Sequence, residues 1–179
     1  MSLFKYVHRW SGLALILAGA YIALIGRINP IGAVLALIGL SGLQIEQGQK
    51  GGTLSLAGWI LVILGTLVYA AVGIFLLFFT PTGQSIARAI QSADYFAGFA
   101  LTLGYIFMGV AEKMAGVFNG NNGVVLAFGA LLALLIGEWG ALLLGFGMVW
   151  LGYSLFTDKR IAVQANPPVA SKKKTKKLS

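Results

Sequence analysis

Apolar residues occur along the chain in long blocks, and polar residues gather in short segments between them. The blocks cover residues 10–26, 31–45, 54–80, 95–111, 123–137 and 139–156. Several approach the roughly 20 residues that a helix needs to cross a hydrocarbon core about 30 Å thick. They lack the alternation of polar and apolar residues that barrel strands require. The pattern predicts an all-α, polytopic helical membrane protein.

The first two blocks are separated only by Gly26-Arg27-Ile28-Asn29-Pro30. The proline has no amide donor and disfavours a helical conformation at the residue before it. One helix over residues 10–45 would be about 54 Å long at about 1.5 Å per residue, far more than a bilayer core. We therefore expect two short spans joined by a tight turn.

The last two blocks are joined by Gly137-Glu138-Trp139-Gly140. A single helix over 123–156 would be about 51 Å long, so a break is expected, and the glycines mark its position. Glu138 would then lie near the membrane surface, with Trp139 as an interfacial anchor.

The resulting model has six transmembrane helices: a short hairpin, two longer spans and a second short hairpin, all within residues 1–157. Residues 81–94, which are too polar to cross, are expected to form a short interfacial helix. Of the 13 lysines and arginines, a cytoplasmic N-terminus places only Arg27 and Arg88 outside. This agrees with the positive-inside rule and puts both termini in the cytoplasm. A four-span arrangement gives nearly the same charge bias, and it is disfavoured by length and by Pro30.

The C-terminal segment 158–179 is basic, contains two adjacent prolines and is expected to be a poorly ordered cytoplasmic tail. Anionic inner-leaflet lipid would attract its lysines at about 1 kcal/mol per residue. The lysines concerned are Lys172, Lys173, Lys174, Lys176 and Lys177. The tail lacks interleaved aromatic residues and a fold to present them, so nucleic acid is not the expected partner.

Glycine is frequent, with 25 residues, and much of it is periodic. One series recurs every seven residues at Gly12, Gly19 and Gly26, and another every four at Gly129, Ala133, Gly137, Ala141 and Gly145. Small residues let membrane helices approach closely, and van der Waals contact then holds the helices together. The stripes predict tight packing, either among the helices of this chain or against partner subunits.

Arg27 and Glu138 are the main candidates for an ion pair or a ligand site, because both hairpin turns would lie at the same membrane depth. The alternative is a solvated turn residue at each position. The remaining acids Asp94, Glu46 and Glu112 are expected in loops or at span ends. No second acid is expected within a span, so the sequence predicts no proton relay and no paired carboxylates.

His8 is expected to be an interfacial anchor, and it is the one candidate for a haem or pigment ligand. With one histidine and no cysteine, an intrachain bis-histidine or thiolate metal site is excluded. No metal or cofactor is implied by a motif. The aromatic residues leave a bound lipid, quinone or carotenoid open.

The sequence has no phosphate-binding loop, dinucleotide fingerprint, metalloprotease motif or nucleophile elbow. We therefore expect a protein without catalytic machinery, not an enzyme, that serves as a structural or accessory subunit of a larger membrane assembly. Its expected partners are membrane lipids and membrane protein subunits. The alternative is a small transporter or substrate-binding component using polar residues near Arg27 and Glu138. The expected location is the plasma (inner) membrane, with an internal energy-transducing membrane as the alternative.

Overall fold

The computed structural model describes residues 3–26, 28–47, 50–79, 83–116 and 121–157, which are helical apart from short turns and contain no strand. The helices are α1 (Leu3–Ile25), α2 (Pro30–Gln47), α3 (Gly52–Phe78), α4 (Gln84–Ala115), α5 (Asn122–Ile136) and α6 (Glu138–Thr157). Among the described helices, α1, α3, α4 and α6 are long and apolar enough to cross a membrane, whereas α2 and α5 are shorter apolar helices. The predicted all-helical fold is confirmed for the described residues, and four of these helices could span a membrane.

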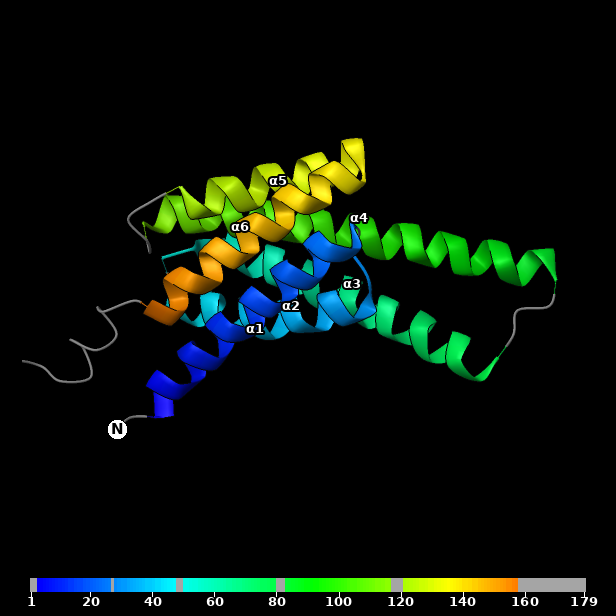
Figure 1. Cartoon of the computed structure of the whole chain (residues 1–179), viewed down its shortest axis with the longest axis horizontal. Helices are drawn as coiled ribbons and strands as arrows, with labels where there is room; N and C mark the ends of the chain where they lie inside the picture. Colours follow the sequence, from blue (N-terminus) through cyan, green and yellow to red (C-terminus); the bar gives the residue numbers. More distant parts are fainter. Residues whose placement is uncertain (1–2, 27, 48–49, 80–82, 117–120, 158–179) are drawn as a thin grey trace, which may run out of the picture.

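The six helices form a closed ring in which each packs on the next and α6 returns to pack on α1 (Figure 1). Consecutive helices run antiparallel. We call the end of the bundle where α1 meets α2 and α5 meets α6 the turn end. The opposite end, which holds the N-terminus and the end of α6, is the terminal end. Helices α3 and α4 project past the other helices at the turn end (Figure 1).

The first predicted turn is confirmed. Helix α1 ends at Ile25, Gly26 has φ +72°, and α2 begins at Pro30. The Asn29 side chain caps α2, because its carbonyl oxygen accepts the Gly32 N–H at 3.0 Å. Proline suits the first helical position because the amide hydrogen it lacks would have no partner there.

The second predicted turn is also confirmed, and it consists of a single residue. Helix α5 ends at Ile136 and α6 begins at Glu138, with Gly137 at φ +60° and ψ −119° between them. Side chains are excluded from this conformation by contact between the β-carbon and the backbone. Glycine therefore allows the chain to reverse direction without a longer loop.

The predicted interfacial helix over residues 81–94 is wrong as a separate element. Helix α4 runs without interruption from Gln84 to Ala115, 32 residues, so the polar segment forms the first turns of a long helix. No glycine or proline lies between Gln84 and Asp94 to break the helix, and Asp94 therefore lies on a helix and not in a loop.

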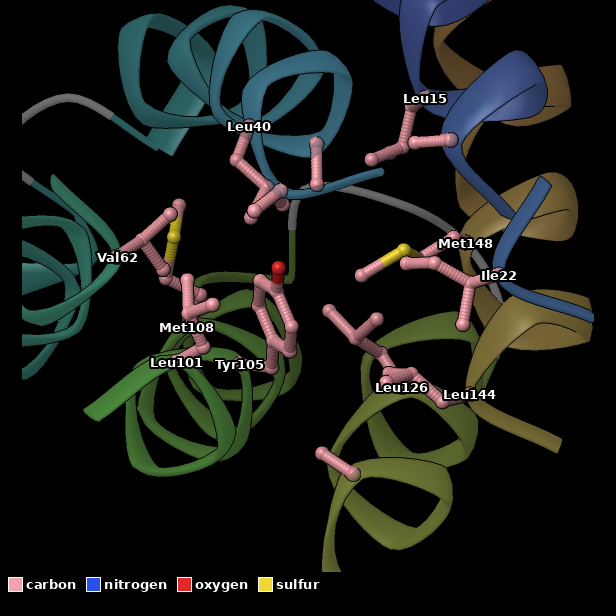
Figure 2. Packing of buried hydrophobic residues seen from close by; sticks show 14 of the residues in the cluster. Leu15, Ile22, Leu40, Val62, Leu101, Tyr105, Met108, Leu126, Leu144 and Met148 are labelled. Atoms are coloured by element: carbon pink, nitrogen blue, oxygen red, sulfur yellow. The ribbon is translucent and has the colours of Figure 1, made fainter. Parts of the chain in front are cut away.

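The core lies along the middle of the ring, where all six helices contribute buried apolar side chains. Figure 2 shows Tyr105, Leu101 and Met108 on one side and Ile22, Met148 and Leu144 on the other. Between neighbouring helices the contacts are made by small residues. A β-carbon built on Gly12 would lie 2.8 Å from the Gly152 carbonyl oxygen on α6, so the α1 and α6 backbones touch.

Candidate functional site

A cavity of about 350 Å³ lies at the turn end and is bordered by both hairpin turns and by α3 and α4. We call it the turn-end cavity. Its lining residues are Ile25, Gly26, Ile28, Tyr69, Asp94, Tyr95, Gly98, Phe99, Thr102, Ala133, Leu134, Gly137, Glu138 and Ala141. Its volume is within the range typical of small-molecule sites, about 300–1,000 Å³.

Two carboxylates line this cavity, from two different helices. Glu138 is the first residue of α6, and Asp94 lies in the third turn of α4. Both side chains are exposed, so each is available to a ligand that enters from the turn end. The sequence predicted Glu138 as a candidate and expected Asp94 in a loop or at a span end, so the convergence of the two was missed.

Arg27, the predicted partner of Glu138, lies outside the described residues, and the predicted ion pair therefore stays a prediction. Its neighbours Gly26 and Ile28 both line the turn-end cavity with Glu138. A β-carbon built on Gly26 would lie 3.5 Å from the Glu138 β-carbon. The two hairpin turns are thus in contact, which agrees with the equal membrane depth expected from the sequence.

Buried polar side chains form the inner part of the cavity. Tyr69 is 7% exposed and Thr102 is 3% exposed. The Tyr69 hydroxyl fits against α4 because position 98 is glycine, where a β-carbon would lie 3.3 Å from it. Tyr95 and Phe99 add aromatic rings on the exposed side.

These groups favour a cation as ligand. Two carboxylates supply negative charge, and aromatic faces attract cations, with gains of about 0.5–2 kcal/mol per contact. Among the residues with defined placement, no group of three or more histidines or acids could hold a metal ion. Ca²⁺ takes six to eight oxygen ligands, more than two carboxylates provide, whereas aromatic faces beside carboxylates suit an organic ammonium group.

A second polar group is buried at the terminal end. The Gln47 side chain donates a hydrogen bond from Nε2 to the Met108 carbonyl oxygen at 3.2 Å, and the Ser55 hydroxyl lies within hydrogen-bond distance of the side-chain oxygens of Gln44 and Gln47, to one of which it donates. Asn122 donates from Nδ2 to the Ser154 hydroxyl at 2.7 Å. These bonds link α2 to α3 and α4, and α5 to α6.

Glu112 is fully buried in this region, near the end of α4. Its Oε2 accepts the N–H of Gly123 at 2.8 Å, in the first turn of α5. The expected position at a span end is confirmed, but the burial was not predicted. Glu112 is buried because it lies on the inward face of α4, where it follows the buried Tyr105 and Met108 at helical spacing.

His8 is 1% exposed and lies inside the bundle, not at its surface. The side chain does not face outward as an anchoring residue would, because His8 shares the buried stripe of α1 with Ser11, Leu15 and Ile22. Its role as a haem or pigment ligand stays a prediction.

The small-residue stripes are used within the chain. Gly12 and Gly19 face α6 at Gly152 and Gly145, and Gly129 faces Leu144. Ala141 is buried, Ala133 lines the turn-end cavity, and Gly26 and Gly137 form the turns. Of the two alternatives, internal packing accounts for these faces. The tail lysines Lys172, Lys173, Lys174, Lys176 and Lys177 lie outside the described residues.

No known protein family model, curated protein or solved structure matches the chain.

Proposed function

We propose that the protein is a membrane-embedded binding component that takes up a small organic cation, such as a protonated amine, in the turn-end cavity. This corresponds to the substrate-binding alternative drawn from the sequence. The observation that carries it is the convergence of Asp94 and Glu138 on one cavity with Tyr69, Tyr95 and Phe99. We further infer that α2 and α5 also cross the membrane, giving six spans. The excess of cations near the terminal end supports a cytoplasmic location for that end.

The position of the carboxylates supports reversible binding. Both lie at the turn end and are exposed, so neither carboxylate carries the desolvation free energy of a deeply buried charge before a ligand binds. A cation held between two carboxylates gains from both, while the aromatic rings shield it from water and strengthen the attraction. Removing one carboxylate should therefore weaken binding, and removing both should abolish it.

We expect tetramethylammonium chloride to raise the unfolding temperature of the protein in detergent more than sodium chloride at equal ionic strength, because a ligand that binds only the folded state stabilises it. The double variant Asp94→Asn, Glu138→Gln should lose the difference between the two salts. Arg88→Gln provides the control, since it changes one exposed charge on α4 outside the cavity. Equal responses of wild type to both salts, or an undiminished response of the double variant, would contradict the proposal.

A second candidate is the accessory subunit expected from the sequence, and one feature favours it. Gly73 on α3 lies beside Pro30, the first residue of α2. The part of α3 that follows Gly73 carries exposed apolar side chains, among them Leu77 at 81% and Phe78 at 76% exposure. A membrane protein partner could cover this surface.

Purification in mild detergent should then yield a second membrane chain in fixed ratio. The double variant Leu77→Ser, Phe78→Ser should release that chain, and the control variant Leu142→Ser should retain it. Retention of that chain by the double variant would exclude this surface as its docking site.

A further inference from the structure

Polar groups recur along one face of α4 from the turn-end cavity to the terminal end. Asp94, Gly98 and Thr102 line the cavity, and Tyr105 and Glu112 follow on the same face at spacings of three to seven residues. A helix places residues three or four apart on one face, about 4.5–6 Å apart along its axis. The face therefore carries polar groups across the whole thickness of the bundle.

The middle of this face holds the unusual group. The Tyr105 hydroxyl is fully buried and has no hydrogen-bond partner among the described residues. Figure 2 shows it directed toward the middle of the ring, between the side chains of α3 and those of α1 and α6. On α3, the buried Thr66 hydroxyl likewise lacks a partner within the described part of the chain. A buried polar group without a partner costs about 1–3 kcal/mol, and ordered water usually satisfies such groups.

The interval between Tyr105 and Glu112 is also bridged by polar atoms. The Met108 carbonyl lies one turn after Tyr105 and accepts the buried Gln47 side chain, which contacts Ser55. Glu112 follows one turn later, about 6 Å farther along the axis.

We propose that this face of α4 is a proton pathway, in which water held at Tyr105 and Thr66 connects the turn-end cavity to Glu112. A hydroxyl both donates and accepts, so Tyr105 can receive a proton from one water while releasing its own to the next. A proton enters at the cavity, one leaves beyond Glu112, and no electron moves. The membrane potential or a pH difference supplies the driving force. This pathway needs no bound amine and so is independent of the proposed binding function.

The apolar surroundings of the pathway decide its selectivity. Leu40, Leu101 and Met108 belong to the same core cluster as Tyr105 and lie close to it (Figure 2). A metal ion or amine would have to shed its hydration shell there without acidic side chains to replace it. Protons pass by exchange along hydrogen bonds and need no such space.

The test uses the full chain reconstituted in phosphatidylcholine vesicles that contain potassium and a pH-sensitive dye. Valinomycin then creates an inside-negative potential, and the rate of internal acidification is measured. Wild type should acidify the vesicles faster than protein-free vesicles do. Tyr105→Phe should lower the protein-dependent rate at least about tenfold, because the missing hydroxyl leaves its neighbouring water unsatisfied in an apolar surrounding. Tyr153→Phe, an exposed residue on α6, should leave the rate unchanged.

Folding failure does not obscure the result. Tyr105→Phe removes an oxygen that has no partner among the described residues, so its unfolding temperature should match wild type. Glu112→Gln keeps an acceptor for the Gly123 N–H and should also lower the flux. Proton flux no greater than in protein-free vesicles, or an undiminished flux in Tyr105→Phe, would overturn the pathway. Loss of the tetramethylammonium effect with flux intact would remove only the binding function.

Discussion

Replacing Gly19 by alanine should destabilise the protein far more than replacing Gly73 by alanine, although both substitutions add one methyl group to a transmembrane helix. A β-carbon on Gly19 would collide with the Gly145 carbonyl oxygen and lie 2.9 Å from Val149 N on α6. These are backbone atoms that cannot move without separating α1 from α6. On Gly73 the nearest atom would be Pro30 Cγ at 3.6 Å, an ordinary contact.

The expected cost at Gly19 is about 1–3 kcal/mol or more, the usual range for overpacking, and Gly19→Leu should prevent folding. At Gly73 we expect less than about 0.5 kcal/mol, or a slight gain from helix propensity. Unfolding in detergent with increasing denaturant, followed by circular dichroism, measures both. Equal unfolding midpoints for the two alanine variants would mean that the α1–α6 contact is not close in solution.

Both hairpin turns could be predicted because the two apolar blocks that flank each turn are together much longer than a bilayer core is thick. Pro30 fixed the first turn and Gly137 the second, and both lie where expected. The start of α4 could not be predicted in the same way. The polarity of residues 84–94 indicates that they do not lie in lipid, but it does not say whether the helix stops there. In the structure the helix continues, since nothing in its sequence breaks it.

The candidate site was predictable in part. Glu138 is conspicuous because it is isolated among apolar residues. Glu138 and Asp94 line one cavity because closure of the ring brings α4, α5 and α6 around it. Helical periodicity within one segment does not show which helices will be neighbours, so this could not be predicted. The same holds for His8 and Glu112, whose burial depends on which face of each helix turns inward.

Gly123→Ala should produce the largest loss of stability of any single methyl addition in the terminal half of the bundle. The added β-carbon would collide with both the Glu112 carboxylate and the Gly109 carbonyl oxygen on α4. Relieving the clash would break the buried bond from the Gly123 N–H to Glu112. Overpacking costs about 1–3 kcal/mol and a lost buried hydrogen bond about 0.5–1.5 kcal/mol, so we expect roughly 2 kcal/mol or more.

Denaturant unfolding measures this loss, and Val124→Ala, on the exposed side of the same helical turn, is the matched control with an expected change below about 1 kcal/mol. Glu112→Gln separates the two causes, because the amide oxygen still accepts the Gly123 N–H and adds no volume. It should cost much less than Gly123→Ala. A cost as large as that of Gly123→Ala would instead show that the carboxyl group of Glu112, and not the close approach of α4 and α5, holds this end of the bundle together.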